Sequence, residues 1–394
     1  MRSISLLRHL ALFIVVVAGP VASAEIAASP ATADPPVGPA APLPSALFLV
    51  TPIEPPGSLP GAAPARIGSP LVGDALEPPD YGPAGKEEDL RAAGPLGAGY
   101  WDGSEYFLGR VGVVVVLVES DGTEEPSTED WTAAEEALVL AGVGEAMDWW
   151  AARAPGRRLE FHFEIHTGVP VAREPIRMAQ RDEEIWIGDA LESLGFSSAN
   201  VFRGTRDLAS AFQEREKLDW TFTIYVVDSS EDEDGMFSDG FFAYAYLGGP
   251  YMVLTLDNDG WGAENLASVC AHETGHIFYA LDQYYAAHVP CDRVAGYLGR
   301  ETRNSEYGSC GENEAACIMR SRPLASASLS ETARGQVGWA DSNGDGIPDP
   351  LGAPPEIEVR DSSGGSAVRV EGRAAVGSIA NRNPLGYGHA IAVD

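Results

Sequence analysis

Two histidines and a glutamate in the middle of the chain have the types and the spacing of a metal-binding site with an acid–base group. They form the pattern His272-Glu273-x-x-His276. Residues four apart on an α-helix lie about 40° apart around its axis, so both imidazoles can reach one metal ion. Glu273 can lean over the same ion, where it would take a proton from a water molecule. The pattern therefore predicts metal-assisted hydrolysis on a helix.

A catalytic zinc ion also needs a third protein ligand, because its usual site combines three protein ligands with one open position. Asp282 is the first candidate after His276. On a continuous helix Asp282 would lie about 600° further around the axis, on the wrong side. We therefore expect the helix to break after His276, so that the chain can bring Asp282 back to the metal.

The segment 272–284 resembles the metzincin zinc peptidases, and is most similar to the immune-inhibitor-A-like and snapalysin-like secreted enzymes whose last ligand is aspartate. In the first of these the helix leads into an Asp-(Glu/Gln)-Tyr tripeptide, which is Asp282-Gln283-Tyr284 here. The resemblance implies His272, His276 and Asp282 as zinc ligands. It implies Glu273 as the general base of a peptidase.

One position departs from the family pattern. Tyr279 stands where the family has a turn-forming glycine, and a left-handed backbone costs a tyrosine about 1–2 kcal/mol. Either the turn is built differently or the third ligand lies elsewhere. The alternative is a thermolysin-like site whose third ligand is a later glutamate, Glu301 or Glu306.

The resemblance extends to residues outside the helix. Metzincins carry a methionine in a tight turn beneath the zinc ligands, and Met319 in Cys317-Ile-Met-Arg320 has a suitable position. Methionine is also an ordinary core residue, so ordinary core packing is the alternative role. The tyrosines that flank the ligands, Tyr284, Tyr285 and Tyr307, are candidate stabilisers of an oxyanion.

The N-terminal quarter has the features of an exported protein. Residues 1–24 resemble a secretory signal peptide, with Arg2 and Arg8, an apolar run and a small-residue cleavage site. The apolar run is too short to span a bilayer. Residues 25–104 are rich in Ala, Pro and Gly, which predicts a disordered spacer; an inhibitory propeptide is the alternative. We expect a secreted, extracellular protein with no membrane insertion after signal cleavage.

Charge and cysteine content agree with that location. The 394 residues carry a formal net charge of −32, which repels phosphate backbones and excludes nucleic acid as a natural partner. The four cysteines favour disulfides in an exported protein. Cys291–Cys310 is the preferred pair, although the sequence leaves other pairings open. Cys270 lies in the metal-site helix and is expected to be a buried free thiol.

The order of elements predicts an α/β (α+β) domain over residues 105–340. Buried or alternating strands are expected at 110–119, 159–166, 220–227, 241–246 and 251–256, and helices at 129–153, 182–194, 200–217 and 262–279. Thr128 is the expected cap of the first helix. The metzincin resemblance implies a mixed, twisted sheet above the active-site helix and a loop-rich lower half. One of the last two strands would bind extended peptide at its edge.

The C-terminal part contains a second type of metal-ligand pattern, in residues 341–352. Oxygen donors alternate as in short calcium loops, and the expected ligands are Asp341, Asn343, Asp345, the Ile347 carbonyl and Asp349. The acidic loop 228–240 is either a further calcium loop or a solvated loop. Residues 353–394 alternate like the strands of a short β segment.

The sequence therefore favours a secreted zinc-dependent endopeptidase that hydrolyses protein or peptide substrates and also binds Ca²⁺. A different class of protein is the alternative: a calcium-dependent extracellular binding or adhesion protein with a structural metal site. Glu273 distinguishes the two, because a purely structural metal site has no use for a general base.

Overall fold

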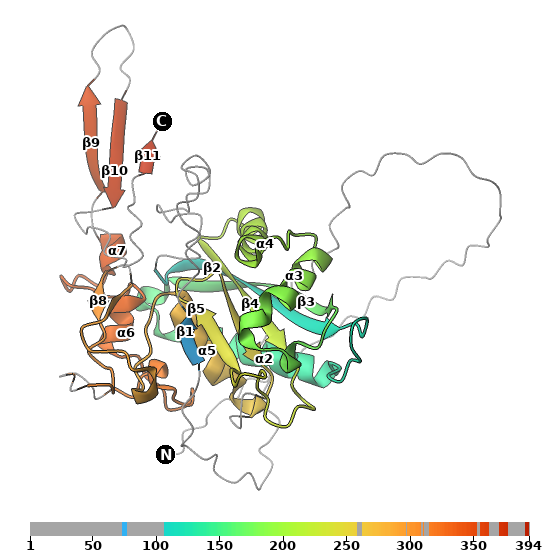
Figure 1. The fold of residues 1–394 in the computed structure, drawn as a ribbon. Coiled ribbons are helices and arrows are strands. Elements are labelled where there is room, and N and C mark those ends of the chain that lie inside the picture. The colour runs from blue at the N-terminus through green and yellow to red at the C-terminus, as the bar shows by residue number, and fades with distance from the viewer. Residues whose placement is uncertain are drawn as a thin grey trace, which may run out of the picture. The chain divides into compact units, whose positions relative to one another are not determined.

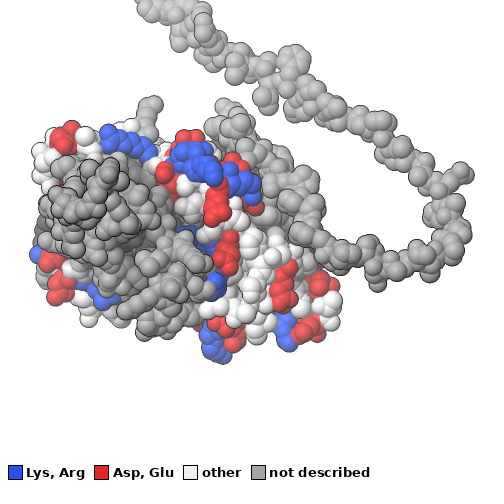
Figure 2. All heavy atoms as spheres, turned by 90° about the horizontal axis from the view of Figure 1, so that it is seen from above, with Lys and Arg blue, Asp and Glu red and all other residues white. Residues whose placement is uncertain are grey.

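The computed structural model describes residues 73–76, 106–257, 262–296, 298–308, 310, 315–352, 355–361, 370–376 and 391–393. The predicted signal peptide, 1–24, and most of the predicted spacer, 25–104, lie outside these residues. No helix in the described ranges is long and apolar enough to cross a membrane. In the coloured part of Figure 2, basic side chains lie among acidic ones.

A mixed six-stranded sheet forms the centre of the molecule, which agrees with the predicted α/β class. Its order is β1 (Gly73–Leu76), β5 (Ala243–Tyr246), β6 (Tyr251–Thr255), β4 (Trp220–Val227), β2 (Gly109–Ser120) and β3 (Leu159–Val171). Strands β6, β4, β2 and β3 are parallel, whereas β5 is antiparallel to β6. β1 pairs in parallel with the outer edge of β5.

Helices cover both faces of the sheet (Figure 1). Val113, Val115 and Leu117 of β2 pack in one core with α2 (Ala133–Arg153) and α5 (Leu266–Ile277). The alternate residues of β2 pack in a second core with α3 (Glu183–Ser193) and α4 (Val201–Glu216). A strand buried on both faces needs apolar residues at every position, which explains the unbroken valine run.

The predicted start of the first helix was wrong. α2 begins at Ala133, and its cap is Thr132 rather than Thr128. The Thr132 hydroxyl accepts from the Glu135 backbone N–H at 3.3 Å, and the Glu135 carboxylate accepts from Thr132 N at 2.8 Å. This reciprocal capping box follows from the Thr-x-x-Glu spacing, which satisfies two free N–H groups at once.

The chain after α5 has little regular structure, as expected. It contains β7 (Val294–Ala295), β8 (Arg300–Glu301), the 3-10 turn Ile318–Arg320 and α6 (Glu331–Gln336). The preferred disulfide, Cys291–Cys310, is present, and Cys270 and Cys317 are buried free thiols. Burial raises the pKa of the Cys270 thiol well above its usual range, which keeps it protonated.

The C-terminal part contains α7 (Asp349–Gly352) and a separate antiparallel sheet. This sheet consists of β9 (Pro355–Asp361), β10 (Val370–Val376) and β11 (Ile391–Val393), in the order β11-β10-β9. The short β segment predicted from the alternating pattern is therefore present in the described residues.

Candidate metal centre

The predicted metal-site helix is α5, and it is shorter than the sequence suggested. It spans Leu266–Ile277 rather than 262–279, after a 3-10 turn at Ala263–Asn265. Every residue of α5 is buried, and its apolar side chains belong to the core beneath the sheet. The site is therefore built on a rigid element enclosed by the rest of the domain.

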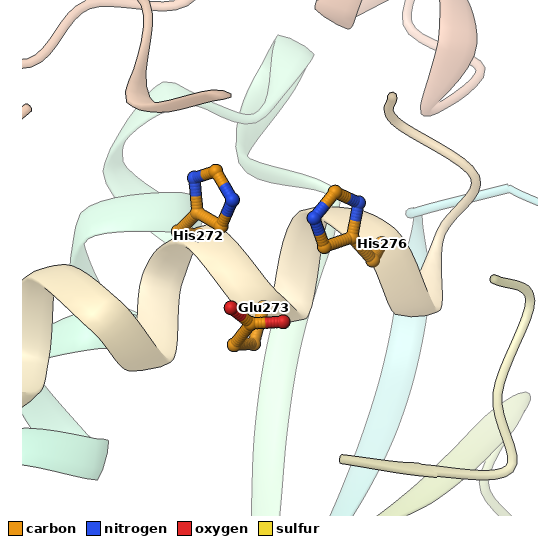
Figure 3. Close-up of side chains that lie close together, drawn as sticks. All are labelled: His272, Glu273 and His276. Atoms are coloured by element: carbon orange, nitrogen blue, oxygen red, sulfur yellow. The ribbon is translucent and has the colours of Figure 1, made fainter. Parts of the chain in front are cut away.

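His272 and His276 lie on the same side of α5, with Glu273 between them along the helix (Figure 3). One ligand atom from each of these three buried residues lies within 4.8 Å of the other two. They form a group that could hold a metal ion. Glu273 is 1 % exposed, so its carboxylate acts in a water-poor environment where electrostatic interactions are strong.

Backbone carbonyls fix the tautomer of both histidines. His272 Nδ1 lies 2.9 Å from the Ile318 carbonyl oxygen, and His276 Nδ1 lies 2.7 Å from the Ala280 carbonyl oxygen. A carbonyl can only accept, so each Nδ1 carries a proton, and each Nε2 is left to take a second proton or to bind a metal. A carbonyl partner of this kind orients a histidine for metal binding.

The chain turns back after α5 and brings Asp282 to the histidines. Asp282 Oδ1 lies 2.9 Å from His272 Nε2 and 3.3 Å from His276 Nε2. Asp282 is 3 % exposed. Burial alone would raise the pKa of its carboxyl, but His276 and His272 outweigh burial and hold that pKa below its usual range. Asp282 is therefore ionised at neutral pH, the form that binds metals.

Tyr279 makes the return possible by adopting the left-handed conformation, with φ at 69°. The turn thus has the backbone that a glycine would provide, although the residue is a tyrosine. Tyr279 is fully buried and packs with Leu247, Leu281 and Ala295. A Cβ on Gly248 would lie 2.6 Å from the Tyr279 ring, so only glycine fits there. Packing of the ring compensates for the strained backbone.

Replacing Tyr279 by glycine tests this balance. Relief of the left-handed strain is worth about 1–2 kcal/mol, whereas loss of a buried aromatic ring costs about 3–5 kcal/mol. We expect Tyr279→Gly to lower the free energy of unfolding by about 2 kcal/mol, measured by urea denaturation. Tyr279→Phe keeps the ring and the strained backbone, so it should lower the free energy of unfolding less than Tyr279→Gly. A more stable glycine variant would show that strain dominates.

Met319 lies beneath α5 and is fully buried. A Cβ on Gly275 would lie 2.5 Å from the Met319 sulfur, so Gly275 provides the space for this contact. The Met319 carbonyl accepts a hydrogen bond from Gln283 N at 2.7 Å, which ties the methionine turn to the residue after Asp282. The turn therefore supports the ligands from below.

Sequence reasoning missed a buried polar network that holds the Asp282 segment. The Gln283 side-chain oxygen accepts from Asn304 Nδ2 at 2.7 Å and from Ser330 Oγ at 3.2 Å. The Gln336 side-chain oxygen accepts from Leu281 N at 3.0 Å. These partners come from distant parts of the chain, so no local pattern indicated them beyond the position of Gln283 next to Asp282.

The three flanking tyrosines differ in their positions. Tyr284 is buried, with its ring centroid 6.2 Å from that of His272. Tyr285 and Tyr307 are exposed and contact each other, with ring centroids 5.7 Å apart. Tyr284 is therefore the one of the three that adjoins a metal-site histidine ring in the described contacts.

The two alternative third ligands have other partners. Glu301 accepts from Arg303 Nε at 2.6 Å. Glu306 accepts from Arg322 Nη2 at 3.1 Å and from Tyr285 N at 3.2 Å. Both carboxylates pair with arginine, whereas Asp282 lies against the histidines.

The predicted calcium loop at 341–352 begins with an exposed turn, 341–346, whose carboxylates bind its own backbone, and it ends in α7. Asp341 accepts from Gly344 N and Gly346 N, both at 2.8 Å. Asp345 accepts from Ile347 N at 2.8 Å, and its carboxylate also accepts from the Asn343 amide. Asp349 accepts from Ser342 and begins α7. Calcium binding by this loop stays a prediction.

No protein-family model and no curated protein matches this chain. The functional argument therefore depends on the geometry of the site and on the chemistry of its donor atoms.

Proposed function

We propose that this chain is a secreted zinc-dependent endopeptidase of the metzincin type. The observation that carries the proposal is the position of Asp282, whose Oδ1 lies 2.9 Å and 3.3 Å from the Nε2 atoms of His272 and His276. Two imidazoles and a carboxylate are a usual ligand set for catalytic zinc. Glu273 is adjacent and buried, in the position of a general base.

Three further features support the metzincin type. The chain turns at Tyr279 with the left-handed backbone that the family's glycine would have. Met319 lies in a turn beneath the helix, against Gly275. The sheet places the antiparallel strand β5 beside the parallel strands and close to α5, since Gly248 N donates to the His276 carbonyl at 3.0 Å.

In the proposed reaction, His272, His276 and Asp282 would hold zinc. A zinc ion bound there would polarise the scissile carbonyl and activate a water molecule. Glu273 would take the proton from that water and deliver it to the leaving amine. Tyr284 is the best placed of the three tyrosines to stabilise the oxyanion, because its ring lies beside His272.

Protein or peptide substrates suit this chemistry, and an extracellular location suits the disulfide and the predicted signal peptide. The alternative, a binding protein with a structural metal site, does not explain the buried Glu273, because such a site needs no general base. Calcium is proposed as a second, structural cation.

Digestion of a mixed peptide library by the purified protein tests the proposal. We expect internal peptide bonds to be cut, cleavage to stop with a zinc chelator, and cleavage to return when zinc is added back. Mass spectrometry of the products identifies the cleaved bonds. If the native chain and the Leu76→Asp variant described below both bind zinc fully but cleave no peptide, the result would favour the binding protein.

The sheet edge beside the proposed site is occupied by the chain itself. β1 comes from within residues 25–104, the predicted spacer or propeptide, and forms a strand. It pairs with β5, and its Leu76 carbonyl accepts from Leu247 N at 2.9 Å. An extended substrate would use the same edge by strand addition. The geometry favours the inhibitory-propeptide alternative for this segment.

Loosening β1 should therefore activate the proposed peptidase. Leu76 is half-buried against the core formed with α3 and α4, and losing that contact costs about 1.4 kcal/mol, or about tenfold in the population of displaced β1. We expect Leu76→Asp to raise the cleavage rate of a short peptide about tenfold. Leu76→Met, which keeps the contact, should match the native chain. Equal rates for all three would show that β1 does not compete with substrate.

A further inference from the structure

Two neighbouring parallel strands end in carboxylates on one side of the sheet. β2 and β4 pair in register as far as Val118 and Val227, so Glu119 and Asp228 follow at the same level. In both strands the residues two positions earlier belong to the core formed with α2 and α5. Strand side chains alternate, so Glu119 and Asp228 point to that face. In open α/β sheets, ligands bind at the carboxyl ends of parallel strands.

Two further carboxylates lie near this edge, one in the segment that precedes α2 and one that accepts hydrogen bonds from it. Glu174 is 2 % exposed, and its Oε2 accepts from Thr128 N at 3.2 Å and from Glu129 N at 3.4 Å. Glu129 is 4 % exposed, and its Oε2 accepts from Glu231 N at 2.8 Å. Glu231 belongs to the loop that begins at Asp228, so the two carboxylates lie beside the ends of both strands.

Two oxygens of this group have no hydrogen-bond donor among the residues that the structure describes. Glu119 Oε2 accepts from Trp131 N at 3.1 Å, and Asp228 Oδ1 accepts from Ser230 N at 2.9 Å. The second oxygens, Glu119 Oε1 and Asp228 Oδ2, are buried and unpartnered. Asp228 is only 2 % exposed. Buried carboxylate oxygens are normally paired or coordinate a metal, because desolvation is otherwise costly.

The charges of the group also require a partner. Burial, together with the nearby charges of Asp228 and Glu174, raises the pKa of Glu119 and of Glu129 to about 7. Burial also raises the pKa of Glu174, although Arg177 opposes this shift, and one guanidinium does not balance four carboxylates. A divalent cation would neutralise the mutual repulsion.

We propose that Glu119, Glu129, Glu174 and Asp228 form a calcium site at the carboxyl ends of β2 and β4. Calcium suits an all-oxygen site, since it takes about 6–8 oxygen ligands in flexible geometry. The oxygens of these carboxylates lie further apart than the ligand atoms of His272, Glu273 and His276, which are within 4.8 Å of one another. Water and backbone carbonyls complete the coordination. The ion links the start of α2 to two strands of the sheet.

The site differs from both calcium loops that the sequence suggested. In the loop 228–240, the Asp232 and Asp234 carboxylates accept from backbone N–H groups of that loop. Asp228 is the buried acidic residue of this loop, and it lies near carboxylates from three other segments. The exposed loop at 341–352 contributes no ligand to the proposed site.

Thermal unfolding of the full chain, in calcium and in the chelator EGTA, tests the proposal. We expect a hundredfold excess of calcium over its Kd to raise the Tm by about 5–10 °C. The double variant Glu119→Gln/Asp228→Asn should lose this response. In EGTA it should melt no lower than the native chain, because the unbalanced charges are gone. Asp234→Asn, in the exposed part of the loop, should respond like the native chain. An unchanged calcium response in the double variant would overturn the site.

Terbium luminescence gives a readout that leaves the carboxylates intact. Trp131 adjoins the site, because its N–H donates to Glu119 and its indole Nε1 donates to the Val118 carbonyl at 2.8 Å. Tb³⁺ bound there should emit on tryptophan excitation, and calcium should quench the emission by competition. Trp131→Phe should remove most of the signal, and Asp341→Asn should leave it unchanged. If Asp341→Asn removes the signal and Trp131→Phe keeps it, the ion lies in the loop at 341–352. The absence of sensitised emission from the native chain would also overturn the proposal.

Discussion

Replacing Glu273 by glutamine is expected to lower the peptide-cleavage rate about 10³-fold, within the range that general acid–base catalysis contributes. The amide keeps the size of the carboxylate but cannot take a proton from water. His272, His276 and Asp282 are unchanged, so the variant should bind as much zinc as the native chain. The rate is measured on a fluorogenic peptide and the zinc by mass spectrometry of the intact protein.

Glu264→Gln is the matched control, because it makes the same change on the exposed turn that precedes α5. It should keep the native rate. A Glu273→Gln variant that retains zinc and native activity would exclude Glu273 as the general base. Loss of zinc from the same variant would instead make Glu273 a ligand.

Replacing Asp282 by alanine is expected to weaken zinc binding by more than about 100-fold, which is the upper range for loss of an outer-shell partner alone. The side chain lies against both histidine Nε2 atoms. Its removal leaves two imidazoles, fewer than a catalytic zinc site uses. Competition with a chromophoric chelator gives the zinc affinity, and circular dichroism verifies the fold.

Glu301→Ala and Glu306→Ala serve as controls, because they remove the two alternative ligands. Both variants should bind zinc like the native chain, since their carboxylates pair with arginines. If Asp282→Ala binds zinc with native affinity and either control loses zinc affinity, the third ligand is that glutamate. Asp282 would then have only a structural role.

Local spacing was sufficient for the histidine group and for the main elements. His272 and His276 share a helix face because the α-helical period is fixed by the backbone, and the valine run of β2 could only be a strand buried on both sides. The presence of the central helix, the positions of β2, β4 and β6, and the Cys291–Cys310 disulfide were predicted correctly. The errors lay at the ends of elements. α2 begins at Ala133, because Thr132 and Glu135 form its capping box, whereas the sequence had suggested Thr128 as the cap.

The position of Asp282 depended on contacts that no local pattern contains. A left-handed Tyr279 is unfavourable alone, and it is stable here because its ring is buried against Leu247, Leu281 and Ala295. The polar network through Gln283 and Asn304 then holds the segment. The carboxylates at the ends of β2 and β4 are a similar case, because acidic residues spread over the sequence indicate a solvated surface.

The sequence by itself therefore determined which residues can carry the chemistry and which helix presents them, because helix and strand periods are local properties of the backbone. The tertiary structure alone decided that Asp282 returns to the histidines, that β1 pairs with the sheet edge and that four carboxylates lie near two strand ends. Those outcomes depend on burial and on hydrogen bonds between segments far apart in the chain, and local sequence does not encode such contacts.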